Sequence, residues 1–200
     1  MKYKRIRFMA GLLLCELALG GVSLVMADEQ IAKGWLAAGS NPGDYQMGAD
    51  RAVAHSGKAC GYIKSSLPEP KGFATLMQMF KAGTYAGKRV RMTGYVKAAA
   101  IENWAGLWMR VDGPEGKMLA FDNMQSRPIK GTREWTKYDI VLDVPENSLA
   151  IAFGILLSGR GQAWVDDLQF QVVGRDVPTT NTEEAGKELS QAPQNLSFED

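Results

Sequence analysis

The sequence has little cysteine and little histidine, with two cysteines and one histidine among 200 residues. Cys15 lies in an apolar N-terminal stretch that is expected to be removed. The chain that remains has only Cys60, so it can form neither an intrachain disulfide nor a cysteine zinc site. Cys60 stands in a strand-like run with no activating base in view, which predicts a buried, inert thiol. His55 is followed by Ser56, but adjacency supplies neither the alignment nor the orienting acid of a catalytic triad. Phosphate-loop and dinucleotide glycine motifs are also missing. The sequence therefore predicts that the protein is not an enzyme.

The sequence also lacks an excess of either positive or negative charge, since its net charge is +1. Removing residues 1–27 takes away four basic residues and one acidic residue, which leaves a net charge of −2. A near-neutral chain offers no electrostatic footprint for nucleic acid. The sequence also shows no helix-turn-helix pattern, and no long stretch keeps helical periodicity. We therefore expect no nucleic-acid partner.

The N-terminus has the pattern of a secretory signal peptide. A basic start is followed by an apolar run from Phe8 to about Met26, and small residues stand at Val25 and Ala27. This predicts cleavage after Ala27 and a periplasmic or extracellular protein with no other membrane association. An uncleaved membrane anchor is the alternative, against which Glu16 and three glycines count. A lipoprotein attached at Cys15 is a third possibility, disfavoured by the large Leu14 before it.

Most of the remaining chain alternates apolar and polar residues in short runs separated by turn signals. From Lys88, "KRVRMTGYVKAAAI" places Val90, Met92, Gly94 and Val96 on one side. Short strands at this spacing indicate an antiparallel sandwich or barrel. "VDGPEGKML" and "LLSGRGQAW" are predicted hairpins, each with glycine for positive φ. Residues 175–194 are polar, without a core pattern, and are predicted to form a linker.

Several longer phrases resemble those of galactose-binding-like jelly rolls, the architecture of many carbohydrate-binding modules. They include "GWLAAGSNPGDYQMGAD", "TLMQMFKAGTYAGKRVRMTGYVK", "GLWMRVDG" and "GQAWVDDLQF", and with similar phrases they cover roughly residues 34–173. The chain also resembles a bacterial group of such domains of unclear role. The resemblance implies an all-β fold, an antiparallel two-sheet jelly-roll sandwich, over residues 28–174.

One phrase expected from this resemblance is displaced. Such modules open with a strand of the form N-L-x-F-E just before Gly-Trp, whereas here "NLSFED" stands at residues 195–200. We expect these six residues to return to the sandwich as a circularly permuted strand, with Leu196 and Phe198 docked beside the N-terminal strand. A frayed tail and a swap into a neighbouring molecule are the alternatives.

Two adjacent aspartates, Asp166 and Asp167, interrupt a strand-like run. Neighbouring residues on a strand face opposite sides, so both can point the same way only across a bulge. The resemblance implies that Asp167 and Glu199 are ligands of a structural calcium ion, with carbonyl groups near residues 56–58. Calcium takes six to eight oxygens, several of them from carbonyls. The alternative is that Asp167 accepts hydrogen bonds from turn amides or pairs with a lysine or arginine.

The run "WAGLWMRVDG" provides a candidate binding surface. Leu107, Met109 and Val111 share one face, so Trp108 and Arg110 are predicted on an outer sheet face. An aromatic ring can stack on the apolar face of a sugar while polar groups bind its hydroxyls. The alternatives are that Trp108 packs beneath a loop and that Arg110 and Asp122 form a cross-strand ion pair. The predicted ligand-binding set is Gln78, Trp104, Trp108, Arg110, Asp122 and Asn123.

Together these patterns predict a non-catalytic exported module that binds carbohydrate or glycan. The competing prediction is a structural or protein-interaction sandwich with no small-molecule ligand and a protein partner on its sheet face. The sensory half of a regulator is a third possibility, which predicted export and the missing helix-turn-helix pattern disfavour. The link from fold to ligand is an analogy, because one fold serves many functions.

Overall fold

The computed structural model describes residues 31–180. The predicted signal peptide, residues 181–194 of the predicted linker and the predicted strand 195–200 lie outside the described residues. Within residues 31–180 no helix has the length and apolar character needed to cross a membrane. The described elements are β1 (Leu36–Gly39), the short 3-10 helix η1 (Pro42–Asp44), β2 (Tyr45–Asp50), β3 (Cys60–Ser65), β4 (Phe73–Lys81), β5 (Lys88–Asp112), η2 (Pro114–Gly116), β6 (Met118–Asp122), β7 (Ile129–Val144), β8 (Ala150–Ser158) and β9 (Gln162–Val173).

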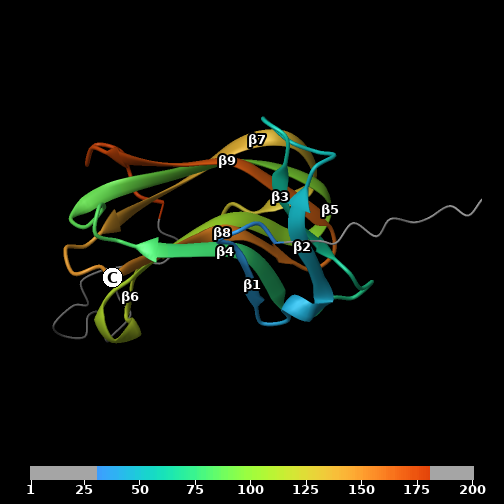
Figure 1. The fold of residues 1–200 in the computed structure, drawn as a ribbon, viewed down its shortest axis with the longest axis horizontal. Coiled ribbons are helices and arrows are strands. Elements are labelled where there is room, and N and C mark those ends of the chain that lie inside the picture. The colour runs from blue at the N-terminus through green and yellow to red at the C-terminus, as the bar shows by residue number, and fades with distance from the viewer. Residues whose placement is uncertain (1–30, 181–200) are drawn as a thin grey trace, which may run out of the picture.

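The strands form two facing layers that share one long strand, β5. Residues 88–99 of β5 pair with β7 and β9, and β9 continues through β3 to β2; we call this layer the first sheet. Residues 104–112 pair with β8 and, at their end, β6, and β8 continues through β4 to β1; this is the second sheet. All these pairings are antiparallel. Figure 1 shows β5 turning at one end of the molecule to pass from one layer to the other. The predicted all-β, antiparallel two-sheet sandwich is confirmed.

A change of phase inside β5 allows it to serve both sheets. The inward residues are even-numbered as far as Ala98, but from Ile101 onward the buried core residues are odd-numbered. Between them Ala100 has a φ of 51°, and the register against β7 shifts on both sides of it. Since strand side chains alternate faces, one residue in the left-handed conformation reverses which residues point inward.

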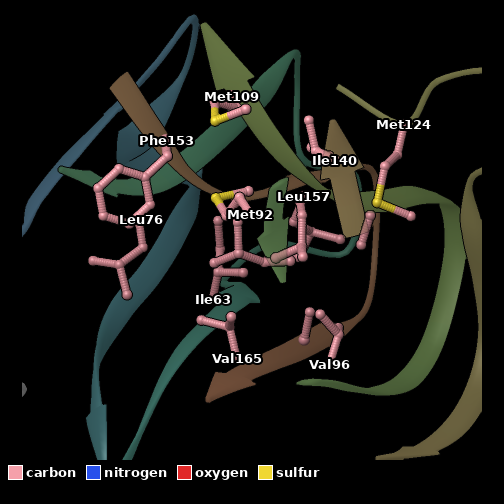
Figure 2. Close-up of a cluster of buried hydrophobic side chains, with 14 of the residues drawn as sticks. Ile63, Leu76, Met92, Val96, Met109, Met124, Ile140, Phe153, Leu157 and Val165 are labelled. Atoms are coloured by element: carbon pink, nitrogen blue, oxygen red, sulfur yellow. The ribbon is translucent and has the colours of Figure 1, made fainter. Parts of the chain in front are cut away.

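The core lies between the two sheets and is built from the faces that the alternation predicts. Met92 and Val96 come from the first half of β5, while Leu107 and Met109 come from the second half, and all four are fully buried. Figure 2 shows Met92 and Met109 in one cluster with Leu157 of β8 and other residues of both sheets. Burial of such side chains contributes about 1.5–3 kcal/mol each relative to exposure, so this cluster is the main source of stability.

One of the two predicted hairpins is confirmed, and the other is wrong. "VDGPEGKML" joins β5 to β6, which pair in antiparallel register. "LLSGRGQAW" instead links β8 in the second sheet to β9 in the first sheet, and these two strands are not paired. Its glycines are required for a different reason: Gly161 has a φ of 134°, and a Cβ there would lie 2.8 Å from the Ile101 backbone. A tight crossover therefore uses the same turn residues as a hairpin.

The first residues after β9 lie against the free edge of β7. Thr180 exchanges hydrogen bonds with the backbone of Val141, and Arg89 donates to the carbonyl oxygens of Arg175 and Val177. Arg89 also forms an ion pair with Asp143, and this guanidinium holds the pKa of the Asp143 carboxyl below its usual range. The polar stretch predicted as a linker therefore begins with an ordered segment that covers a sheet edge.

Candidate functional site

The outer face of the second sheet has a groove with a volume of about 540 Å³. Every strand of that sheet contributes to it. The lining is mostly aromatic and aliphatic, with a few polar groups at its sides. The lining residues are Ala38, Gly39, Gly72, Phe73, Thr75, Met77, Trp104, Trp108, Arg110, Phe121, Asn123, Leu156 and Ser158. Ligand sites of small molecules have volumes of about 300–1,000 Å³ and a similar mixture of apolar walls and few polar groups.

Trp108 forms the base of the groove. Its side chain packs in an apolar cluster, separate from the main core, that includes Ala152 and Leu156, and only 7% of its surface is exposed. The indole Nε1 donates to Thr75 Oγ1 at 2.6 Å, and that hydroxyl donates to the carbonyl oxygen of Ile155. Gly154 pairs directly with Trp108 across the strands and places no side chain beside the ring. These contacts fix the ring in one orientation.

Three aromatic rings of the groove are more accessible: that of Phe73, which is 38% exposed, and those of Trp104 and Phe121, each half-buried against the Trp108 cluster. Phe121 stands directly opposite Arg110 in the β5–β6 pairing. Arg110 has a side-chain exposure of 41% and forms its ion pair with Asp112, with Nε 2.8 Å from Asp112 Oδ1. The Arg110–Asp122 pair considered from the sequence is therefore replaced by a pair within β5.

The groove includes four of the six residues predicted for ligand binding: Trp104, Trp108, Arg110 and Asn123. Asp122 is fully buried on the opposite face of β6, since its neighbour Phe121 points into the groove. Gln78 likewise lies on the inner side of β4, in a separate cavity of about 400 Å³ lined by Trp35, Phe80, Phe153, Leu168 and Phe170. In both cases a shift of one residue changes the face, because strand side chains alternate.

Asp122 has a structural role at the edge of the groove. Its Oδ2 lies 2.6 Å from Arg127 Nη2, and its Oδ1 accepts from Arg127 Nη1 and from the backbone N–H of Met124. Arg127 also donates to the carbonyl oxygen of Asp139 in β7. The carboxylate therefore ties the loop after β6, which begins with Asn123, to the first sheet.

Sequence reasoning missed the groove residues that come from β4 and β8. β8 is buried on nearly its whole length, so it shows no alternation that would identify Leu156 as outward-facing. β4 did contain a usable signal, because Thr75 and Met77 share a face. The sequence alone does not say whether that face points outward, because this depends on which strands lie beside β4.

The acidic doublet lies at a bulge in β9. Thr93 pairs with Gln169 and Tyr95 pairs with Asp166. Two residues of β9, Asp167 and Leu168, therefore stand opposite one residue of β5, Gly94. Asp167 has a φ of 51°, which turns its side chain toward the same region as that of Asp166. This is the bulge that the adjacent charges require if both are to point to one side.

Both carboxylates bind the loop between β2 and β3. Asp166 Oδ2 accepts from the backbone N–H groups of His55 and Ser56, and Asp167 accepts from the Ser56 hydroxyl at 2.6 Å and contacts His55 Nδ1 at 2.6 Å. The His55 ring stacks on Tyr95, with ring centroids 3.7 Å apart. The doublet therefore fastens a loop, and the calcium site proposed at Asp167 and Glu199 stays a prediction because Glu199 lies outside the described residues. Residues 31–180 contain no group of three or more histidine, cysteine, aspartate or glutamate side chains arranged to hold a metal.

The same contacts predict a pH dependence of stability. The Ser56 hydroxyl and then the His55 ring hold the pKa of the Asp167 carboxyl below its usual range. A carboxyl with a lowered folded pKa contributes stability above its unfolded pKa of about 3.9, and that contribution is lost as the pH falls through the folded value. We expect Asp167→Asn to reduce the urea midpoint at pH 7 and to differ less from the parent protein below about pH 4. Ser56→Ala should show a smaller version of the same pattern, whereas a pH-independent difference would contradict the assignment.

Two sets of reactive side chains in residues 31–180 lie outside the groove: the cluster of His55, Ser56 and Asp167, and the Cys60 thiol. Ser56 Oγ donates to Asp167 and not to the His55 ring, so these three side chains are not ordered as a nucleophile, base and acid. Burial raises the pKa of the Cys60 thiol to about 12, which keeps it protonated at neutral pH. Its Sγ lies 3.0 Å from the carbonyl oxygen of Val53.

Sequence comparison finds a relative of this chain but no family model that matches it. A Bacillus subtilis (strain 168) protein described as the uncharacterized HTH-type transcriptional regulator YbfP is 51% identical over 173 residues, which cover 86% of this chain and 58% of that protein. The chain thus corresponds to little more than half of that relative's length.

Solved structures with the same fold include carbohydrate-binding modules. The xylan-binding domain CBM22-1 of Paenibacillus barcinonensis Xyn10C is 18% identical, with a TM-score of 0.50 over 72% of this chain and 89% of that domain. The CBM22-1–CBM22-2 tandem of the same protein is 16% identical, with a TM-score of 0.53 over 78% of this chain and 45% of that one. The enzymatically active domain of the bacteriophage CBA120 tailspike protein 4 is 12% identical, with a TM-score of 0.53 over 70% of this chain and 20% of that one. The protein therefore has the jelly-roll fold of carbohydrate-binding modules.

Proposed function

We propose that the protein is a non-catalytic module that binds saccharides in the groove on the second sheet. The observation that supports this most directly is the composition of the groove, in which Trp104, Trp108 and Phe121 provide apolar surface beside the polar ends of Arg110 and Asn123. The likeness to carbohydrate-binding modules supports the fold on which such a groove is built.

The groove suits a sugar ring for physical reasons. A pyranose has an apolar face of C–H bonds, which packs on an aromatic ring, and a rim of hydroxyl groups, which needs directional hydrogen bonds. Trp108 is already held by Thr75, so it offers a rigid surface that loses little freedom on binding. Phe73, Trp104 and Phe121 line the same groove, are more exposed than Trp108 and remain accessible for stacking.

Binding without catalysis is favoured by the charges around the groove. Glycoside hydrolysis uses two carboxyl groups on either side of the scissile bond. Of the described residues that line the groove, none is an aspartate or a glutamate. We place this binding activity in an exported protein, on the basis of the signal peptide predicted at residues 1–27.

Titration with saccharides tests the proposal. Trp104 and Trp108 lie in the groove, so a bound sugar should change the intrinsic tryptophan fluorescence in a saturable manner. We expect at least one member of a panel of neutral plant and bacterial oligosaccharides to do so, with a matching heat in calorimetry. If no member of the panel produces a saturable signal by either method, the proposal is wrong and a protein-interaction module is favoured.

The Bacillus subtilis relative favours a second candidate function, a ligand-sensing module within a regulator. Its description names a transcriptional regulator, and this chain matches 58% of it. A sandwich that binds a small molecule would suit both functions, because sensing also begins with ligand binding. This chain shows no helix-turn-helix pattern, so DNA binding does not distinguish the two functions. A change in the oligomeric state of the chain on saccharide binding, measured by light scattering, would favour the sensing module, because a sensor must convert ligand binding into a changed association.

A further inference from the structure

The charge of the groove is cancelled locally by one residue outside it. Among the described lining residues, Arg110 is the one with an ionisable side chain that is charged at neutral pH. Asp112 follows two residues later on the same face of β5 and forms an ion pair with the guanidinium. Nη2 donates a hydrogen bond to Oδ2 at 3.0 Å, and Nε lies 2.8 Å from Oδ1 without the geometry of a hydrogen bond. Only 17% of the Asp112 side chain is exposed, so solvent and salt weaken its attraction to Arg110 less than they would at the surface.

The other polar groups of the groove are mostly satisfied within the protein. Thr75 accepts from Trp108 and donates to a carbonyl oxygen, while Ser158 accepts from Asn103 and donates to the carbonyl oxygen of Gly72. Asn123 Oδ1 accepts from the backbone N–H of Gln125. The side-chain groups that remain for a ligand are donors: the Trp104 indole N–H, the Asn123 amide nitrogen and the edge of the Arg110 guanidinium that faces away from Asp112.

A donor edge of this kind accepts either hydroxyl oxygens or a carboxylate, and the charge decides between them. An isolated guanidinium would favour the carboxylate strongly, because a charge-assisted fork to an anion is stronger than one to a neutral oxygen. Here a bound anion would also lie close to the Asp112 carboxylate, and like charges at short range in a partly buried site repel. The attraction of Arg110 for an anion is therefore largely offset, whereas its hydrogen bonds to neutral hydroxyls are kept.

From these contacts we infer that the groove selects neutral saccharides over uronates and that Asp112 is the residue that sets this preference. The inference rests on the proposed function and adds to it the substrate class. Asp112 does not line the groove; it acts by neutralising and orienting Arg110. A volume of about 540 Å³ gives room for a short oligosaccharide rather than a single ring.

The test compares sugars that differ only in charge. Cellotriose and β-1,4-mannotriose are each measured against the counterpart in which C6 is oxidised to a carboxylate, by calorimetry at low salt. We expect the parent protein to bind the neutral member of a recognised pair at least tenfold more tightly. Asp112→Asn keeps the shape of the side chain and an acceptor oxygen for Arg110 but removes the negative charge. It should raise the affinity for the uronate at least tenfold and change that for the neutral sugar less than threefold.

A matched control distinguishes the local pair from general charge. Glu102 is another β5 carboxylate paired with an arginine, Arg160, and both side chains are about half exposed. Glu102→Gln makes the same change in net charge and should leave the ratio of neutral to uronate affinity unchanged. Raising the salt concentration should reduce the uronate affinity gained in Asp112→Asn, because the gain is electrostatic.

Each result decides a separate point. Equal or tighter binding of uronates by the parent protein, or an unchanged preference in a folded Asp112→Asn variant, overturns the role of Asp112 while leaving saccharide binding intact. Equal shifts in Asp112→Asn and Glu102→Gln would assign the preference to net charge and overturn it as well. If neither triose binds, a saccharide of the panel that does bind is compared with its oxidised counterpart instead, and if no saccharide of the panel binds, the proposed function itself is overturned.

Discussion

Replacing Asp122 with alanine is expected to lower the free energy of unfolding by about 3 kcal/mol, at the lower end of the range for breaking a buried ion pair. Asp122 is fully buried, and its removal leaves Arg127 without its carboxylate partner and the Met124 N–H without its acceptor. The Arg127 side chain is 35% exposed and can turn partly toward solvent, which limits the loss. Chemical denaturation monitored by tryptophan fluorescence measures the difference.

The exposed pair between Glu102 and Arg160 is the matched control for this prediction. Both partners are about half exposed, so Glu102→Ala should cost less than about 1 kcal/mol, as surface ion pairs usually do. Similar losses for Asp122→Ala and Glu102→Ala would show that the buried position of Asp122 has no special importance. Since Asp122 also ties down the loop that begins with Asn123, we further expect weaker saccharide binding by Asp122→Ala at temperatures where it is folded.

Replacing Trp104 with alanine is expected to weaken saccharide binding about thirtyfold, which corresponds to the ~2 kcal/mol lost at a binding hot spot. Trp104 is half-buried at the side of the groove, so its ring contributes accessible surface to a ligand and less to the packing of the protein. Trp108 is a poorer choice for this test because it is buried, and its truncation would destabilise the second sheet by roughly 3–5 kcal/mol.

Trp135 on β7 provides the control for Trp104. It lies on the opposite side of the sandwich, against the His55 ring and outside the groove. Trp135→Ala should therefore leave the dissociation constant for the saccharide unchanged within about twofold. Trp104→Ala should stay folded at the assay temperature and lose less stability than Trp108→Ala, because Trp104 is only half-buried. An equal loss of affinity in both variants would place the binding site elsewhere.

Much of the sandwich could be predicted from the sequence because alternation is a local signal. The inward faces of both halves of β5 follow directly from the spacing of Val90, Met92 and Val96 and of Leu107, Met109 and Val111. What the pattern does not contain is the partner of each strand. The loop at Gly159 and Gly161 has the residues of a hairpin, but the neighbours of β8 and β9 are distant in sequence and made it a crossover instead.

In the candidate site, too, the alternation of the sequence predicts the faces of residues but not the contacts between distant strands and loops. Trp104, Trp108, Arg110 and Asn123 lie together in one groove because three of them belong to a single well-patterned strand and the fourth follows its hairpin partner; their role in binding stays a prediction. Asp122 and Gln78 were expected there because of their chemistry, although their positions in the alternation put them on the inner side. Only the fold showed that the acidic doublet is bonded to the β2–β3 loop, since His55 and Asp167 are 112 positions apart.

The position of β9 also has a consequence for how the molecule is made. β9 is the neighbour of both β5 and β3, yet it is among the last strands to be synthesised, and until it is present those two strands have no common partner. Pairings between such distant segments slow folding, because a large loop must close before any contact compensates for it. β2 and β3 therefore cannot join the first sheet until β9 has been made, whereas the second sheet and the pairing of β5 with β7 can form without it.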